Sequence, residues 1–345
     1  MARSATLRMP PPVKMARVET AEGGTSRHST SVVTFGEALL RLTVPEHGRL
    51  QDADEVQIDV AGAELNVAIA LAHLGVPTSW ISAVPDSPIG RRVELEATGS
   101  GVNIESVARV PGGRLGVFYV EYGVDPRPIS VWYDRQQSTF ANMDSFNVAP
   151  IAGARFVVVS GITPALSKRS AIATRTIVDE AQARGAQVCI DVNYRERLWT
   201  AADARRSLSD LLRRSSIVVC STRDARRVFR CTGTDDEVLV QLHGGWCPQA
   251  DVVALTIGEA GALAFADGVL QRQPGYQTQM VDRFGAGDAF TAGLLWGLLQ
   301  GDLALGLRAG TALAALKCSI RGDHARFTSK ELEDTIDRTS SRITR

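Results

Sequence analysis

Four short runs rich in β-branched residues constrain the fold of this chain more than any other feature of its sequence. The runs are "ARFVVVSG", "AQVCIDVNY", "SSIVVC" and "DVVALTIG", and helix-like segments separate most of them. Strands that alternate with helices form a parallel sheet that helices cover on both faces. Upstream, residues 32–35 read as another buried strand, and "AELNVAIALAHLG" reads as a buried helix that ends at Gly75. The pattern predicts one α/β domain over about residues 31–330.

From Gly116 onward the alternation with helices is interrupted. The segment "GVFYVEYGVDPRPISVWYD" consists of two strand-like runs around a turn that contains Pro and Gly, which is typical of a hairpin. Earlier in the chain, "EVQIDV" alternates Val56, Ile58 and Val60 with polar residues, as a strand with one solvated face does. We therefore expect a small additional β sheet made from about residues 38–61 and 113–136.

The two ends of the chain differ in character from the segment between them. Residues 1–30 are basic and rich in Ser, Thr, Gly and Pro, and they lack the apolar segment of a secretory signal. We predict a disordered N-terminal extension there, and an Arg- and Ser-rich targeting presequence is the alternative. Residues 331–345 are predicted to form a C-terminal tail.

The composition disfavours several classes of function. Lys plus Arg equals Asp plus Glu at 38 each, so no overall field attracts nucleic acid or an anionic membrane surface. No apolar run reaches the roughly 18 residues of a membrane span. The five cysteines are scattered and lack C-x-x-C spacing, which indicates reduced thiols in a cytoplasm. The five histidines are equally dispersed, which disfavours a His-based metal centre.

The stretch "VDRFGAGDAFTAGLLWGLLQG" places Asp288 at the start of a helix that is otherwise apolar all round. Gly285, Ala286 and Gly287 would present backbone N–H groups to a phosphate with little side-chain obstruction. The same helix end should keep Asp288 ionised with an ordinary pKa. That carboxylate could accept the proton of an attacking hydroxyl, because phosphoryl transfer depends more on positioning than on full deprotonation. A capping role for Asp288 is an equally weighted alternative.

The other familiar phosphate-binding motifs are absent from the sequence. It has no G-x-x-x-x-G-K-[ST], no G-x-G-x-x-G after a strand, and no H-R-D or D-F-G pair. In an open parallel sheet, ligands bind beyond the carboxyl ends of the strands. The segments "DVNYR", "STRD" and "TIGEAG", together with "GAGD", are therefore expected at one edge of the sheet.

Two of these motifs resemble those of a known family. "DRFGAGDAFTAG" resembles the C-terminal signature of the PfkB (ribokinase-like) sugar kinases, and "AGAELNVAIALAHLG" resembles their N-terminal G-G-x-x-x-N-x-A segment. "FGEALLRL", "VWYDR", "DVNYRERLW", "ALKCSIRGD" and Arg283 are most similar to the 2-keto-3-deoxygluconate kinase branch. The resemblance covers about residues 31–328. It implies a ribokinase-like fold, with a mostly parallel sheet between helices and a small β-sheet lid.

The resemblance also implies roles for individual residues. Asp288 would be the catalytic base, and Gly285, Ala286 and Gly287 would form the anion hole. The substrate-binding residues would be Gly62, Ala63, Glu64, Asn66, Phe118, Tyr133, Arg135, Arg195 and Asp282. The ATP-binding residues would be Asn193, Ser221, Thr256, Gly258, Glu259, Gly261, Gly287, Ala312 and Ala315, and Asp224 would contact the metal through water. The implied cofactors are ATP and Mg²⁺, and a requirement for a monovalent cation is left open.

Simpler interpretations compete with some of these roles. Glu64 and Asn66 lie where a helix begins and could be capping residues, and each arginine could form a surface ion pair. The sequence also departs from the family pattern. Ala61 replaces a glycine, Phe118 replaces an aromatic hydroxyl, and "STRD" replaces the magnesium-organising N-x-x-E element.

The leading hypothesis is an ATP-dependent kinase that phosphorylates a primary hydroxyl of a sugar acid, with 2-keto-3-deoxygluconate as the first-choice substrate. A planar guanidinium recognises a carboxylate bidentately, which fits Arg135 and Arg195. Closure of the lid would exclude water, and exposed lid strands favour a homodimer in which two lids pair. A neutral-sugar kinase such as a fructokinase is the main alternative. A non-catalytic regulator on the same fold and a nucleoside kinase are weaker alternatives.

Overall fold

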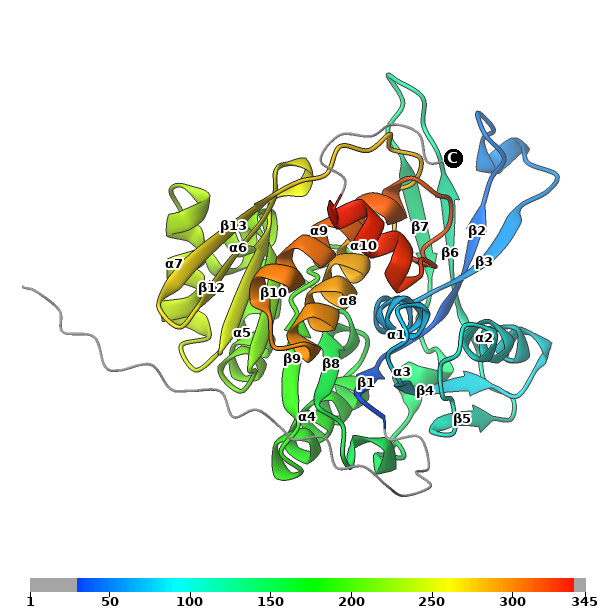
Figure 1. The fold of residues 1–345 in the computed structure, drawn as a ribbon. Helices are drawn as coiled ribbons and strands as arrows, with labels where there is room; N and C mark the ends of the chain where they lie inside the picture. Colours follow the sequence, from blue (N-terminus) through cyan, green and yellow to red (C-terminus); the bar gives the residue numbers. More distant parts are fainter. Residues whose placement is uncertain (1–29, 338–345) are drawn as a thin grey trace, which may run out of the picture.

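The computed structural model describes residues 30–337, and within that range the central sheet has nine strands. Their order is β13-β12-β11-β10-β9-β8-β1-β4-β5 (Figure 1). The strands are β1 (Val32–Phe35), β4 (Thr78–Pro85), β5 (Val107–Val110), β8 (Phe156–Ser160), β9 (Gln187–Asp191), β10 (Ile217–Ser221), β11 (Val252–Thr256), β12 (Gly261–Ala266) and β13 (Val269–Pro274). The pairs from β5 to β11 are parallel, and β12 and β13 join the edge in antiparallel orientation.

Helices cover both faces of this sheet, as the continuous apolar strands predict. One face packs against α1 (Ala63–His73), α2 (Pro88–Gly99), α8 (Ala286–Leu299), α9 (Leu303–Cys318) and α10 (Ser329–Asp337). The other face packs against α3 (Thr139–Asn142), α4 (Lys168–Ala183), α5 (Ala201–Arg213), α6 (Thr222–Phe229) and α7 (Asp235–Trp246). Short 3₁₀ turns are η1 (Leu50–Asp52), η2 (Ala149–Ile151), η3 (Thr163–Ala165) and η4 (Gly258–Ala260). The predicted α/β layering is confirmed.

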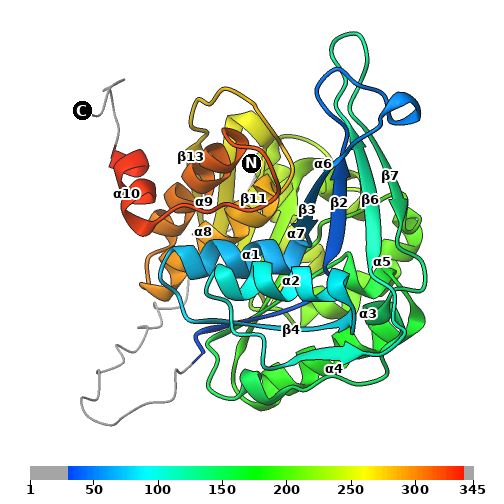
Figure 2. The same ribbon diagram turned by 90° about the vertical axis from the view of Figure 1, so that its right-hand side faces the viewer.

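A second sheet of four strands, ordered β3-β2-β6-β7, extends beyond the helices beside α1 (Figure 2). Its strands are β2 (Leu39–Thr43), β3 (Gln57–Ala61), β6 (Gly116–Glu121) and β7 (Ser130–Asp134), which fall within the two predicted segments. β6 and β7 form the predicted antiparallel hairpin. The expected dry face of β3 is only partly present, because Val60 is buried whereas Ile58 is 41% exposed. Ile58 lies toward the end of this edge strand that is farther from α1.

Helices α8 and α9 approach each other at the level of the backbone. A Cβ added at Gly297 would overlap the backbone nitrogen of Gly306, and one at Gly293 would lie 2.6 Å from the carbonyl group of Ala309. Helices that pack this closely require small residues along the contact, which explains the Gly and Ala pattern of both segments. Ala312 belongs to the same buried cluster. Its small side chain fits this helix packing, and its predicted contact with adenine stays a prediction.

The C-terminal segment differs from the prediction. Residues 329–337 form α10, although residues 331–345 were expected to be a tail. Leu332 is fully buried in the cluster that contains α8 and α9, so one apolar contact anchors an otherwise polar helix. The predicted N-terminal extension lies outside the described residues except for Thr30, whose hydroxyl hydrogen-bonds that of Ser79 at 2.8 Å.

The thiols agree with the cysteine pattern of the sequence. All five cysteines are buried and free of disulfide bonds. None of the helices over residues 30–337 has the length and hydropathy of a membrane span.

Candidate active site

Asp288 lies in the first turn of α8 and is 8% exposed. Asn66 of α1 donates a 2.6 Å hydrogen bond to its carboxylate, and Asn193, which follows β9, donates another at 3.5 Å. Burial raises the pKa of Asp288 to about 6, although the Asn66 hydrogen bond and the charge of Arg195 act in the opposite direction. The predicted ordinary pKa is therefore wrong, because burial outweighs the helix end. The carboxylate is still ionised at neutral pH, and it is a stronger base than expected.

The two glycines before Asp288 have different structural roles. Gly285 has a φ of 76°, and a Cβ at this position would overlap the carbonyl oxygen of Asp323. Gly287 is exposed, and a Cβ there would meet nothing within 4 Å. The N–H groups of Gly287 and Asp288 have no acceptor within the helix, as in the first turn of any α-helix. The turn therefore offers an open, donor-rich position beside the carboxylate, as the sequence predicted for an anion site.

A cavity of about 80 Å³ lies against Asp288. The residues that line it are Glu37, Leu39, Ala61, Gly62, Ala63, Glu64, Asn66, Phe118, Tyr133, Arg135, Ile162, Arg195, Phe284, Gly285, Asp288 and Asp323. All the predicted substrate-binding residues except Asp282 are in this set. They come from the start of α1, from β6 and β7, and from the turn after β9, so the fold brings together segments that are far apart in the sequence.

A wider cleft of about 620 Å³ shares Tyr133, Arg135 and Arg195 with this cavity. Its lining residues are Ile129, Val131, Tyr133, Arg135, Tyr194, Arg195, Glu196, Arg197, Leu198, Arg223 and Arg227. Three of its five arginines are paired, Arg135 with Glu37, Arg223 with Asp224 and Arg227 with Glu196. Arg195 and Arg197 have no carboxylate partner among residues 30–337, so the cleft keeps a positive charge. The exposed Arg195 side chain makes no hydrogen bond or ion pair with the other residues of the 30–337 range. Its guanidinium is therefore available to an anion.

Two predicted ligands are engaged by neighbouring side chains. Glu64 is buried and accepts hydrogen bonds from Ser160 Oγ at 2.7 Å and Thr163 Oγ1 at 2.6 Å. It does not cap α1, whose first turn is preceded by Gly62 without a side-chain cap. Burial raises the pKa of Glu64 despite these hydrogen bonds. Arg135 donates through Nε to Glu37 at 2.9 Å in a buried pair, so its charge is already compensated.

Phe118 and Tyr133 face each other across the β6–β7 pair. Their rings stack with centroids 5.4 Å apart, and both side chains line the inner cavity. Phe118 is 4% exposed, whereas Tyr133 is 40% exposed. The two residues form an aromatic wall under the second sheet, and Tyr133 supplies the only hydroxyl of this stacked pair.

Asp282, a predicted substrate contact, lies outside the lining of the inner cavity. It is 1% exposed, and its carboxylate accepts hydrogen bonds from Arg41 at 2.8 Å, from the N–H of Phe284 at 3.0 Å and from the N–H of Gly322 at 3.0 Å. It does not line the inner cavity, whereas Asp323 does. These three donors give the carboxylate a structural role, and its predicted sugar contact stays a prediction.

The predicted nucleotide-binding residues gather at one edge of the central sheet. Ser221 and Thr256 are register partners at the carboxyl ends of β10 and β11, and Asn193 follows β9. Gly258 and Glu259 lie in η4 beside Thr256, and Gly261 begins β12. Ala315 of α9 is half-buried, and its carbonyl accepts a hydrogen bond from Thr278 at 3.2 Å. The edge is the one where a parallel sheet binds ligands.

Acidic groups lie close together near the same edge. Asp224 is 4% exposed, and its backbone N–H donates to Ser221 Oγ at 3.0 Å. Burial raises the pKa of Asp191 to about 8, with further contributions from the negative charges of Asp288 and Asp224. Among residues 30–337, no three acidic, His or Cys side chains are arranged to hold a metal ion by themselves. A metal here would need oxygen ligands from a bound nucleotide as well.

The sequence interpretation missed several residues of the site. Arg41, Glu37 and Asp323 are buried and charged, and Asp191 ends an apolar strand. For Arg41, Glu37 and Asp191 the available signal was a charge within or shortly after an apolar run, because such a charge needs a partner in the folded protein. Asp323 lies in a polar segment and gave no such signal. The partners themselves could not be identified from sequence spacing.

Comparison with known proteins agrees with this geometry. The family model described as pfkB family carbohydrate kinase matches residues 29–329. A 2-dehydro-3-deoxygalactonokinase of Haloferax volcanii is 37% identical over 311 residues, covering 89% of this chain and 97% of the relative. A 5-dehydro-2-deoxygluconokinase of Bacillus subtilis is 28% identical over 315 residues, covering 89% and 95%. The crystal structure of 2-dehydro-3-deoxygluconokinase from Thermotoga maritima superposes with a TM-score of 0.83 at 29% identity, covering 90% of this chain and 98% of that one. The resemblance predicted from the motifs is confirmed at the level of the family.

Proposed function

The chain belongs to the pfkB family of carbohydrate kinases, and on this basis we propose that it transfers the γ-phosphoryl group of ATP to a primary hydroxyl of a sugar acid. The first substrate to test is 2-keto-3-deoxygluconate, with its 6-phosphate as product. The observation that carries the sugar-acid assignment is Arg195, an exposed and unpaired guanidinium that lines both the inner cavity and the outer cleft of the 30–337 range. A carboxylate bound there would leave the far end of a short sugar chain near Asp288.

In the proposed reaction the substrate hydroxyl donates its proton to Asp288, which Asn66 orients through its 2.6 Å hydrogen bond. The sugar oxygen forms a bond to the γ-phosphorus, and the bond from that phosphorus to the β,γ-bridging oxygen breaks. ADP leaves with the electron pair of the broken bond. The N–H groups of Gly287 and Asp288 stabilise the charge on the transferred group.

The acidic residues at the sheet edge support the use of Mg²⁺. Burial raises the pKa of Asp191 to about 8, and the negative charges of Asp288 and Asp224 contribute to the shift. A divalent cation would compensate these charges. Asp191 and Asp224 would hold the ion together with phosphate oxygens of ATP, and the ion would neutralise charge on those phosphates. A monovalent cation is tested as a further activator by comparing rates in potassium and tetramethylammonium salts.

The substitution Arg195→Ala tests the substrate class. We expect the KM values of both sugar acids, 2-keto-3-deoxygluconate and its galacto epimer, to rise by about 10-fold to 100-fold, because a charged hydrogen bond to the carboxylate is lost. The KM of fructose, if it is phosphorylated at all, should not change. ADP release is measured with these three compounds, ribose and adenosine. Arg213→Ala is the matched control, since Arg213 of α5 is exposed and lies outside both cavities.

Arg135→Ala is a weaker test, because it leaves the buried Glu37 without its partner and so disturbs the fold as well. An unchanged KM for the acids in Arg195→Ala would contradict the sugar-acid assignment. A native preference for fructose would instead favour a neutral-sugar kinase. The stacked pair of Phe118 and Tyr133 gives some support to that alternative, since aromatic rings also bind uncharged sugars.

We also propose that the protein is a cytoplasmic homodimer that pairs through its second sheet, without nucleic-acid or membrane partners. Both β3 and β7 are edge strands of that sheet and carry exposed apolar side chains, among them Ile58 and Trp132. Unpaired strand edges of this kind favour association. The five buried free thiols are those expected of a protein in a reducing compartment.

A further inference from the structure

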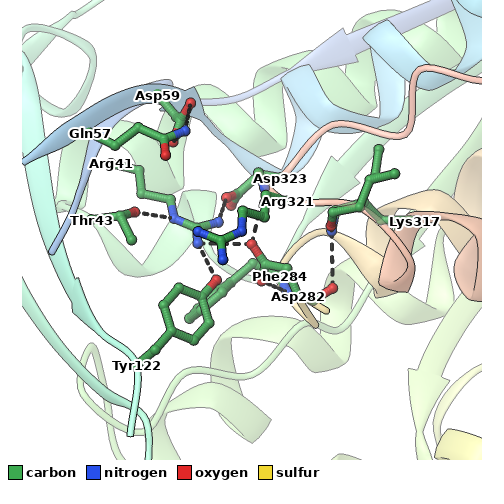
Figure 3. Close-up of polar contacts among 12 residues, drawn as sticks. Arg41, Thr43, Gln57, Asp59, Tyr122, Asp282, Phe284, Lys317, Arg321 and Asp323 are labelled. Carbon is green, nitrogen blue, oxygen red and sulfur yellow. Dashed lines mark hydrogen bonds and ion pairs between the residues drawn. The ribbon is translucent and has the colours of Figure 1, made fainter. Parts of the chain in front are cut away.

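Arg41 is a buried, charged side chain, and the proposed reaction gives it no role. It lies on β2, an inner strand of the second sheet, and is 2% exposed. Its guanidinium donates to Asp282 at 2.8 Å, to Asp323, to the Tyr122 hydroxyl and to Thr43 at 3.0 Å (Figure 3). Burial disfavours its charge, but the two carboxylates outweigh that effect and raise the pKa of Arg41.

Asp282 is held from a second side by another buried cation. Lys317 of α9 has no exposed surface, and its Nζ donates to the carbonyl oxygen of Asp282 at 3.1 Å and to that of Ile320 at 3.3 Å. Arg41 therefore binds the carboxylate of Asp282, and Lys317 binds its carbonyl group. The backbone of this residue is fixed three positions before Gly285.

The same guanidinium is connected to the anion-binding turn, residues 285–288, through two neighbours of that turn, Phe284 and Asp323. Its Cζ lies 4.7 Å from the ring centroid of Phe284, the residue before Gly285. It also pairs with Asp323, whose carbonyl oxygen packs so closely on Gly285 that no Cβ fits between them. The partners of Arg41 thus contact the chain that enters the turn and the chain that packs behind it.

We propose that Arg41 is a positioning residue that couples the second sheet to the anion-binding turn, so that the placement of the sheet sets the placement of Gly287 and Asp288. The coupling rests on the proposed function of that turn. Arg41 moves with the second sheet because it lies on an inner strand, and it acts on the turn only through the contacts described above. A sugar acid that fixes the sheet through Tyr133 would thereby order the phosphoryl-binding amides.

The consequence of this coupling is control over where the phosphoryl group goes. When no sugar lies under the sheet, the turn is less well placed and water is a poor acceptor. When the sugar is bound, the amides and Asp288 are held in position for transfer. Misplacement of such a site by about 1 Å costs on the order of 100-fold in rate.

The variants Arg41→Met and Arg41→Lys test the proposal in the full-length protein. We expect Arg41→Met to lower kcat by about 100-fold while the KM of the sugar acid changes less than about 3-fold, because the substrate contacts remain. Arg41→Lys, which keeps the charge but loses the planar fork, should fall between Arg41→Met and the native enzyme. Arg109→Met is the matched control, because Arg109 of β5 also pairs with a buried carboxylate, Glu94 of α2, but lies outside both cavities. This variant should have native kinetics.

Hydrogen exchange provides the readout that a purely stabilising role would not change. In the native enzyme, we expect the sugar acid to increase protection of residues 283–289 as well as of β7. In Arg41→Met, protection of β7 should still respond to the sugar, whereas protection of residues 283–289 should not. If the turn responds equally in both proteins, or if kcat is unchanged, the coupling is refuted even though the kinase function stands.

If Arg41→Met does not fold, Tyr122→Phe tests the same coupling. This change removes one hydroxyl contact from Arg41 and leaves both of its carboxylate partners in place. The same loss of sugar-dependent protection, to a smaller extent, is expected, and a native response would contradict the coupling. Absence of activity toward every sugar in the native protein would instead contradict the proposed function.

Discussion

Asp288 holds its charge in a position from which water is largely excluded. Burial raises the pKa of Asp288 to about 6, although the amides of Asn66 and Asn193 and the nearby guanidinium of Arg195 offset part of the cost of burying its charge. Because the pKa is raised in the folded protein, the contribution of this group to stability is largest below its unfolded pKa and is lost as the pH rises through about 6. The same burial makes the carboxylate of Asp288 a stronger base, which favours its proposed role as proton acceptor. Burial of Asp288 therefore lowers the stability of the protein and raises the basicity of the carboxylate.

We expect Asp288→Asn to lower activity strongly and to stabilise the protein. The rate should fall by about 10²-fold to 10⁴-fold, as for loss of a general base. The free energy of unfolding at neutral pH should rise by about 1–3 kcal/mol, because the amide can still accept the Asn66 hydrogen bond without a buried charge. Denaturant unfolding and a coupled ADP-release assay measure the two effects. Unchanged activity would contradict the proposed role of Asp288 as the base, whereas absence of activity in the native protein as well would favour the regulator alternative.

The native enzyme should lose kcat/KM as the pH falls through about 6, because protonated Asp288 cannot accept the substrate proton. The sign is opposite to the effect on stability, which increases over the same interval. A pH–rate profile of the native enzyme, with unfolding measured at the same pH values, checks both signs. An activity that stays constant from about pH 7 to about pH 5 would exclude Asp288 as the base.

Among the structural elements, α8 and its turn were the easiest to predict from sequence and the most informative. The apolar run predicted a buried helix, and the two glycines predicted an exposed anion-binding turn. Local patterns also predicted the strands, because runs of apolar residues indicate buried strands. The turn with Pro and Gly between two such runs predicted the β6–β7 hairpin. They could not predict the role of Asp282, whose partner Arg41 is 241 residues away. They missed α10 because a single buried residue, Leu332, anchors it.

The two glycines of the turn give a matched pair of substitutions. Gly287→Ala should leave stability nearly unchanged, since a Cβ there meets nothing, but it should raise the KM of ATP or lower kcat by crowding the phosphate. Gly285→Ala should destabilise the protein by more than about 1 kcal/mol, because φ is 76° and the Cβ overlaps Asp323. Thermal unfolding and steady-state kinetics distinguish the two. Equal effects on stability would contradict this division of roles.

The contact between α8 and α9 predicts a second pair. Gly297→Ala should destabilise the protein by about 1–3 kcal/mol, because the added methyl group overlaps the backbone at Gly306. Gly244→Ala on α7 is the control, since it has open space and alanine favours a helix by about 1 kcal/mol. Denaturant midpoints of the two variants should move in opposite directions. A native midpoint for Gly297→Ala would mean that the helices can separate without cost.

The molecule as a whole consists of a helix-covered sheet and a smaller sheet that extends from it (Figures 1 and 2). If two copies pair through the smaller sheet, Trp132→Arg should shift the protein toward monomer, because Trp132 is 43% exposed on an edge strand. Leu95→Arg on α2 is the control, since Leu95 is 56% exposed outside that sheet. Sedimentation equilibrium measures the change. A native protein that is monomeric at micromolar concentration would contradict the dimer.

The long sequence separations within the site have a consequence for synthesis of the protein. Asn66 and Asp288 are 222 residues apart, and Arg41 and Asp323 are 282 residues apart. A chain still attached to the ribosome can form the early strands. It cannot bring together the proposed base, the amide that contacts it and the buried ion pairs until α8 and the residues after α9 have emerged. The chain therefore becomes active in a single step, late in its synthesis. The first appearance of kinase activity during translation would mark the point at which folding is complete.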